Sequence, residues 1–436
     1  MMLSIVKRQI RSQVCHIRRG DVQVGTAVLY PYRYGLCVML LVLLAACAPA
    51  ETTAPITETT PTASPADLPA GSPAGSGLLT DAPAALPAGL IVIWVENGAL
   101  LRWEAGTTTQ LIEEEVLSAF IAPGGERIAL TRGKDGLAES LRVWAEDDMQ
   151  PIDVPGLVNQ VVWADAETLY VNTAELTALG PTPRDDLYRV NVATRAVTAL
   201  PAGGQVSVQG ETVFVITPGD YGGTPGQIQR LNPDDTLSPV LAFDAVATGS
   251  HFRFYPQVQW VGDTAYVALP QADALYSELA PEPLPVSLWR LTPAPVQVGT
   301  VTASMAGLPQ WSGAGMVFLR REGEANQFAV YTAAIDGTAP ERYAPAAGFA
   351  LAPLWVNAGF VYGQARTYFW GAPGETPRPM AESDILTPPT TLSNSVVLTI
   401  FTEGQVKLLY AEERGRITNL IGERSHMPAT IDAFNG

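Results

Sequence analysis

The chain contains 436 residues, of which 47% are hydrophobic and 16% are charged, and its formal net charge at pH 7 is −17. This acidity argues against nucleic acid and anionic lipid surfaces as partners. With only three cysteines and three histidines, neither a disulfide framework nor a histidine-rich metal site is supported, and we expect no cofactor.

The N-terminal part of the chain carries an export pattern. Arg33 precedes an apolar run from Leu36 to Ala46, which is too short to span a bilayer and ends in Leu44-Ala45-Ala46-Cys47. This pattern resembles the signal peptide and lipobox of a bacterial lipoprotein. The resemblance implies that residues 1–46 are removed and that Cys47 receives a lipid. Because a signal starts close before its apolar run, we expect the true start at Val28 or Leu29.

Residues 47–89 form a segment of different composition. They are rich in Thr, Pro, Ala, Ser and Gly and contain almost no large apolar side chains. Such a segment cannot bury enough surface to offset the entropy of ordering, so we expect a disordered tether. The lipid on Cys47 would then hold the exported domain on the outer face of the cytoplasmic membrane or on the outer membrane.

Residues 90–436 are predicted to form one all-β domain. Short runs of Val, Leu, Tyr, Phe and Trp alternate with turn residues at spacings of about ten residues. A longer repeat is marked by a Trp, a short turn and an apolar strand, at Trp163, Trp260, Trp311 and Trp355. Together with the turn sequence from Ala122 to Ala129, this repeat resembles TolB-like and WD40-like β-propellers.

The repeat also predicts the number of blades. The innermost strands are expected near Phe120, Trp163, Val208, Trp260, Trp311, Trp355, Leu392 and Ile431. The first unit begins directly with Leu90–Val95 and lacks an inner strand, whereas the last unit has an additional strand from Met427 to Phe434. Ring closure explains both irregularities if the C-terminal strand completes the first blade. We therefore predict eight four-stranded blades, with seven as the alternative.

A second marker is an Arg between apolar residues in the third strand of several units. It occurs at Arg102, Arg142, Arg189, Arg230 and Arg290. We expect these arginines to occupy the solvent-facing positions of alternating strands, although they could also line a ligand surface. The recurring Trp is expected to pack between blades.

The connections predict where a ligand would bind. Turns after each Trp are short, whereas the opposite end of the blades would carry long loops at 172–185, 217–226, 243–255 and 270–286. Long loops on a rigid scaffold are usual positions for binding residues. The candidate ligand-binding residues are Asp220, Tyr221, His251, Phe252, Arg253, Tyr255, Asp273 and Tyr276. These aromatic residues could instead pack the loops onto the blades.

No catalytic motif accompanies these loops. The sequence lacks a Gly-Xaa-Ser-Xaa-Gly elbow and a phosphate-binding loop. A Ser-His-Asp triad in the mature chain would need His251 or His426. Asn232-Pro233-Asp234-Asp235 is interpreted as a turn and not as a calcium loop.

The sequence therefore predicts a monomeric, surface-tethered propeller that binds an envelope protein, peptide or glycan without catalysis. The resemblance to TolB-like propellers implies a protein partner. The alternative is a carbohydrate-active hydrolase or lyase that uses carboxylates on the long-loop face.

Overall fold

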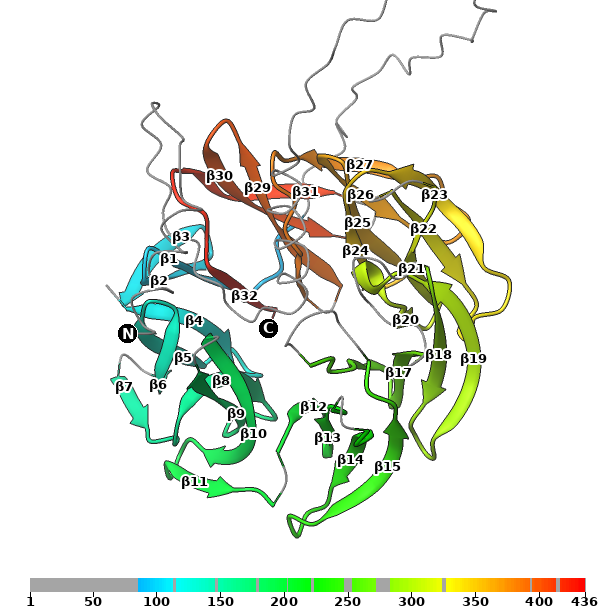
Figure 1. The fold of residues 1–436 in the computed structure, drawn as a ribbon. Helices are drawn as coiled ribbons and strands as arrows, with labels where there is room; N and C mark the ends of the chain where they lie inside the picture. Colours follow the sequence, from blue (N-terminus) through cyan, green and yellow to red (C-terminus); the bar gives the residue numbers. More distant parts are fainter. Residues whose placement is uncertain are drawn as a thin grey trace, which may run out of the picture. The chain divides into compact units, whose positions relative to one another are not determined.

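A computed structural model describes residues 85–435 except 113–114, 146–147, 178–179, 202, 221–222, 247–252, 272–282, 324–326, 393 and 413–415. The described chain consists of strands and one 3-10 turn, η1 (Met305–Gly307). The strands form eight antiparallel sheets of four strands each (Figure 1). This confirms the prediction of eight blades over the alternative of seven.

The first four blades contain strands β1 to β15 together with the C-terminal strand β32. Blade 1 consists of β32 (Thr430–Asn435), β1 (Leu90–Glu96), β2 (Ala99–Glu104) and β3 (Thr107–Ile112). Blade 2 consists of β4 (Val116–Ile121), β5 (Arg127–Lys134), β6 (Leu137–Ala145) and β7 (Asp148–Ile152). Blade 3 consists of β8 (Leu157–Trp163), β9 (Thr168–Thr177), β10 (Gly180–Asn191) and β11 (Ala196–Ala199). Blade 4 consists of β12 (Gln205–Gln209), β13 (Thr212–Thr217), β14 (Gly226–Leu231) and β15 (Leu237–Phe243).

The other four blades follow in chain order. Blade 5 consists of β16 (Val258–Val261), β17 (Thr264–Pro270), β18 (Leu284–Arg290) and β19 (Val296–Ala303). Blade 6 consists of β20 (Gln310–Ser312), β21 (Gly315–Arg321), β22 (Phe328–Ala333) and β23 (Glu341–Ala347). Blade 7 consists of β24 (Ala350–Val356), β25 (Gly359–Gln364), β26 (Thr367–Gly371) and β27 (Arg378–Glu382). Blade 8 consists of β28 (Thr390–Thr391), β29 (Ser395–Thr402), β30 (Gln405–Glu412) and β31 (Ile417–Arg424).

The C-terminal strand closes the ring as predicted. β32 pairs with β1 from Leu90 opposite Asn435 to Val95 opposite Thr430, and in Figure 1 the red C-terminal strand lies beside the first strand. The Asp432 carboxylate accepts a hydrogen bond of 2.8 Å from the backbone N–H of Ile121 in blade 2. This strand therefore links blade 1 to its neighbour as well as completing its sheet.

The hydrophobic core is divided among the blade interfaces. Eight buried clusters are present, and each joins side chains of two adjacent blades. In β1, Leu90 and Val92 face blade 8, whereas Ile91 and Ile93 face blade 2. This follows from the two-residue period of a strand, because a sheet between two others must be apolar on both sides.

The recurring Trp residues join neighbouring blades, as expected. The indole N–H of Trp163 donates to the carbonyl of Phe120 at 3.0 Å, and that of Trp355 donates to the carbonyl of Gln310 at 2.8 Å. Trp260 donates likewise to the Ser207 hydroxyl. Each of these three bonds reaches the inner strand of the preceding blade, so the Trp contributes both apolar area and a fixed polar contact.

The predicted turn sequence from Ala122 to Ala129 comprises the connection 122–126 between β4 and β5 and the start of β5. Gly125 in this turn has a φ of +78°, and a Cβ atom there would lie 2.6 Å from the Phe434 ring of β32. Glycine is therefore required both by the backbone conformation and by the close approach of the C-terminal strand.

Candidate functional site

The two ends of the blades differ in their connections. Turns between first and second strands, and between third and fourth strands, lie at one end, which we call the short-turn face; its longest connection is 334–340. The other end, the long-connection face, carries the links between second and third strands and between blades. It contains connections 218–225, 244–257 and 271–283 in blades 4 and 5.

One predicted loop is a strand pair. Residues 172–185 were expected to form a loop, but β9 and β10 continue through this segment as a hairpin. The hydrogen-bond register, which reaches Gly180 opposite Thr177, overrides the turn-like composition around Pro181 and Pro183. Sequence reasoning missed this hairpin, although the alternation of Thr173, Glu175 and Thr177 was a signal for a strand.

The structure places three of the predicted ligand-binding residues. Asp220 and Arg253 are exposed and Tyr255 is half-buried, and all three lie on connections of the long-connection face. The remaining predicted residues lie outside the described part of the chain: Tyr221, His251, Phe252, Asp273, Tyr276 and the lipidation residue Cys47. The aromatic and polar site over these loops therefore stays a prediction.

Asp220 organises its own loop. Its carboxylate accepts a 3.0 Å hydrogen bond from the Thr224 N–H, and its backbone N–H donates to the Thr224 carbonyl at 3.0 Å. The neck of the loop is narrow, because a Cβ atom on Gly219 would lie 2.9 Å from Ala245 and one on Gly226 would lie 2.3 Å from the Phe243 ring. These contacts hold the two ends of connection 218–225 close together at the long-connection face of blade 4.

A second polar cluster lies where blade 8 meets blade 1. The buried carboxylate of Glu96 accepts from the Trp94 indole at 3.1 Å and from Arg424 Nε at 2.5 Å. His426 Nδ1 lies 3.9 Å from Glu96 and 2.9 Å from the Ser425 hydroxyl. Both neighbours use the same ring nitrogen, whereas a hydrolytic triad needs the hydroxyl and the carboxylate on opposite nitrogens. The cluster therefore joins blade 8 to blade 1 and does not have the arrangement of a hydrolytic triad.

Several ion pairs between described residues lie on the long-connection face. Carboxylates in blades 1, 2 and 7 to 8 are paired with arginine, as in Glu96–Arg424, Glu115–Arg132 and Asp384–Arg366. In the part of blades 3 and 4 that the structure describes, Asp153, Glu175 and Asp244 are exposed and no ion pair joins them to a described residue. Among the described residues, these three exposed carboxylates place negative charge beside the long connections.

The recurring arginines are less exposed than predicted. Arg230 is exposed, but Arg102, Arg142, Arg189 and Arg290 are half-buried. The expectation of solvent-facing positions is therefore not met by these four, and the Nε atoms of Arg102, Arg142 and Arg290 are buried.

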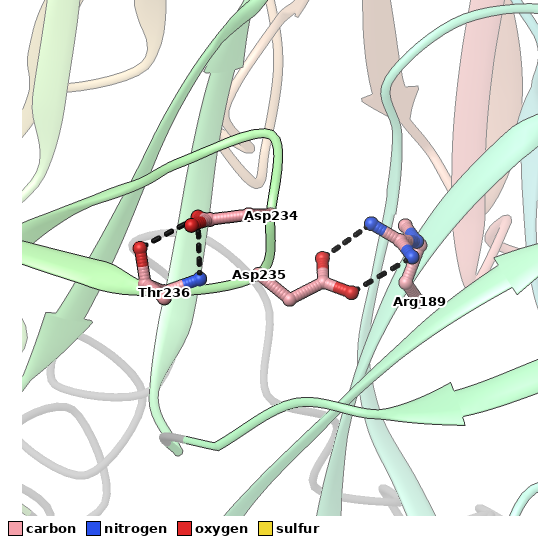
Figure 2. Close-up of polar contacts among 4 residues, drawn as sticks. All are labelled: Arg189, Asp234, Asp235 and Thr236. Carbon is pink, nitrogen blue, oxygen red and sulfur yellow. Dashed lines mark hydrogen bonds and ion pairs between the residues drawn. The ribbon is translucent and has the colours of Figure 1, made fainter.

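One of these arginines, Arg189, forms an ion pair between blades 3 and 4. Its guanidinium in β10 binds the Asp235 carboxylate of blade 4 through two contacts of 2.5 and 3.0 Å (Figure 2). Burial raises the pKa of the Tyr170 phenol, and the Arg189 charge opposes that rise. The pair lies on the short-turn face and links two blades, so it does not form part of the long-connection site.

The predicted turn at Asn232 supports this ion pair. The Asp235 N–H donates to the Asn232 carbonyl at 3.0 Å. The Asp234 carboxylate accepts hydrogen bonds from the hydroxyl and the N–H of Thr236 (Figure 2), and these bonds hold the pKa of Asp234 below its usual value. The interpretation of this sequence as a turn is confirmed.

Two further properties concern the described residues alone. No group of three or more His, Cys, Asp or Glu side chains in the described ranges is arranged to hold a metal ion. Across the same residues, no helix has the length and apolarity required to cross a membrane.

No protein-family model matches the chain, and no curated relative matches it in sequence. Among solved structures, the chain is similar to the Pyrococcus horikoshii acylaminoacyl peptidase, with 11% identity and a TM-score of 0.42 over 78% of this chain and 52% of that one. It is also similar to the β-propeller domain of the Trilobed protease from Pyrococcus furiosus, with 9% identity and a TM-score of 0.42 over 70% of this chain and 97% of that one.

TolB from Acinetobacter baumannii is a third similar structure, with 14% identity and a TM-score of 0.32 over 57% of this chain and 62% of that one. The chain spans about half the length of the acylaminoacyl peptidases that it matches. The activities named for these structures are not carried over to this chain. Its eight-bladed architecture is shown by its own strand pairing.

Proposed function

We propose that the protein is a surface-tethered lipoprotein whose propeller binds an envelope protein, peptide or glycan through the long-connection face of blades 3 to 5. One observation carries this proposal. Connections 218–225, 244–257 and 271–283 all lie at the same end of adjacent blades, whereas the opposite end has short turns. Long connections gathered on a rigid scaffold form a surface that can vary in shape without disturbing the core.

The described side chains support binding without turnover. The Asp220 carboxylate closes its own turn, which is a structural use of the group. His426 has its hydroxyl and carboxylate neighbours on one nitrogen, Nδ1, which is not the arrangement of the base in a hydrolytic triad. A binding module does not require the Asp220 carboxylate or the His426 imidazole to take part in a reaction.

The lipid anchor and the tether would hold this binding module at a membrane surface. Lipid on Cys47 would anchor the N-terminus in a membrane, and the long segment between Cys47 and β1, which begins at Leu90, would let the propeller reach partners at a distance from the lipid surface. Replacing Cys47 with Ser should move the protein from the membrane fraction to the soluble fraction. Unchanged membrane attachment of Cys47→Ser would refute lipid anchoring.

The binding face can be tested with photocrosslinking. A photoreactive amino acid at Thr224, on the exposed loop of blade 4, should crosslink to a component of the cell envelope. The matched control is the same amino acid at Ala358, an exposed residue in the short turn between β24 and β25. Crosslinks from Ala358 and none from Thr224 would place the partner on the wrong face and overturn the proposal.

A further inference from the structure

The hairpin of β9 and β10 extends beyond the strands on either side of it. β9 and β10 remain paired from Ala174 opposite Pro183 to Thr177 opposite Gly180. Pairing of β8 with β9 ends at Ala174, and pairing of β10 with β11 ends at Tyr188. The segments 174–177 and 180–183, which we call the β9–β10 arm, therefore project from blade 3 on the long-connection face as a two-stranded ribbon.

The two edges of this arm differ chemically. Pro181 and Pro183 have no N–H, so their pairs with Leu176 and Ala174 must be the non-hydrogen-bonded pairs of the antiparallel ladder. It follows that the N–H and C=O of Leu176 point away from β10. The β10 edge is protected by proline, a common defence of exposed strands. On the β9 edge, no backbone hydrogen bond joins the N–H or C=O of Leu176 to a described residue.

The surroundings of this free edge combine an apolar side chain with negative charge. Leu176 is 62% exposed, and no other large apolar residue in the described ranges is as accessible. Glu175 is exposed beside it, and Asp153 lies in the segment that leads into Leu157, the β8 residue that pairs with Ala174. Neither carboxylate is joined to a described residue by an ion pair, in contrast to Glu96, Glu115 and Asp384 on the same face.

We propose that the free β9 edge of the arm binds an extended, cationic segment of a partner protein. The segment adds as a strand beside Leu176, exchanges backbone hydrogen bonds with its N–H and C=O, and places lysine or arginine side chains near Asp153 and Glu175. This inference rests on the proposed function and deepens it, because it selects a polypeptide over a glycan and states the chemistry of its side chains.

The edge can be probed with a defined peptide. The probe is a fluorescent octapeptide of alternating lysine and threonine, titrated against the full-length protein in detergent at low ionic strength and followed by fluorescence anisotropy. Its N-methylated analogue has the same charge but lacks the backbone donors of a strand. We expect the analogue to bind at least about tenfold more weakly, because strand addition depends on main-chain hydrogen bonds. Equal affinity of the two peptides would overturn strand addition.

Charge reversal tests the position of binding. Glu175→Lys should weaken binding of the octapeptide by about tenfold, and this effect should shrink in high salt. The matched control is Glu211→Lys, which reverses an exposed charge in the short turn between β12 and β13 on the opposite face. Equal effects of the two substitutions would show non-specific attraction to an acidic protein and would refute binding at the arm.

The two proposals can fail separately. If the octapeptide does not bind at millimolar concentration while Thr224 still crosslinks to an envelope component, the cationic segment is wrong and the binding face stands. If neither the peptide nor the crosslinker detects a partner on the long-connection face, both proposals fail.

Discussion

The Arg189–Asp235 ion pair allows a quantitative test of how much a polar contact between two blades contributes to stability. The pair is bidentate, and its two side chains are 35% and 30% exposed. Bidentate geometry strengthens such a pair, whereas partial exposure screens it. We therefore expect Asp235→Asn to lower the free energy of unfolding by about 1 kcal/mol, which for a chain of this size lowers the melting temperature by about 2 °C or less.

A double-mutant cycle isolates the pairwise energy from other effects of each substitution. Arg189→Leu, Asp235→Asn and the double variant should give a coupling free energy of about 0.5 to 1 kcal/mol in urea unfolding, decreasing in 1 M salt. Arg230→Leu is the matched control, because Arg230 occupies the equivalent position in blade 4, opposite Phe214, and is exposed. A coupling energy near zero, or one that is insensitive to salt, would refute the assignment of this contact as a blade link.

Three further predictions concern the core and the seam, by which we mean the contacts that join blade 1 to blades 2 and 8. Gly125→Ala should destabilise the protein by about 1 to 3 kcal/mol more than Gly374→Ala, since both glycines have φ near +77° but only Gly125 would clash with Phe434; equal losses in thermal unfolding would contradict this. Asp432→Ala should cost about 1 to 3 kcal/mol because it removes the acceptor for a backbone N–H at the inner edge of blade 2, and Asp432→Asn should cost less. Burial raises the pKa of the Tyr362 phenol, so the contribution of this group to stability is complete below pH 10 and is lost as the pH rises from there. Between pH 8 and pH 11, Tyr362→Phe should therefore lose less free energy of unfolding than the unsubstituted protein. Equal losses in the two proteins would contradict the raised pKa.

The fold could be predicted because the repeat is visible as a spacing. Every predicted inner-strand centre lies within or directly beside an observed inner strand, including Leu392, which follows β28. The missing first strand and the additional last strand indicated how the ring closes, because a sheet edge without a partner is an incomplete sheet. These arguments need only the order of apolar runs along the chain.

The contacts between blades could not be predicted in the same way. Arg189 was expected to face solvent, since its partner Asp235 lies 46 residues further along the chain, about one repeat away. The corresponding turn of blade 6 has Gly337 where blade 4 has Asp235, and a Cβ atom on Gly337 would lie 2.7 Å from the Leu288 side chain. The same turn therefore supports an ion pair at one interface and close packing at another.

The candidate site was predicted least completely. The topology confirms that long connections share one end of the blades. The observed hairpin at 172–185 differs from the predicted loop, and its Pro181 and Pro183 are unfavourable inside a sheet but compatible with an edge. Whether Tyr221 or His251 contributes to binding depends on loop positions that a strand pattern does not specify.

The closure of blade 1 by β32 has a consequence for the order of folding. Contacts of the seam join residues far apart in sequence, with separations of 311 residues between Ile121 and Asp432 and of 328 between Glu96 and Arg424. Contacts of such high order form slowly, because a long loop must close before they can contribute. Until residues 430–435 have been synthesised, β1 has an unpaired edge made of apolar residues. The period in which this edge can pair with other chains therefore lasts from the synthesis of β1 until the end of the chain has been made.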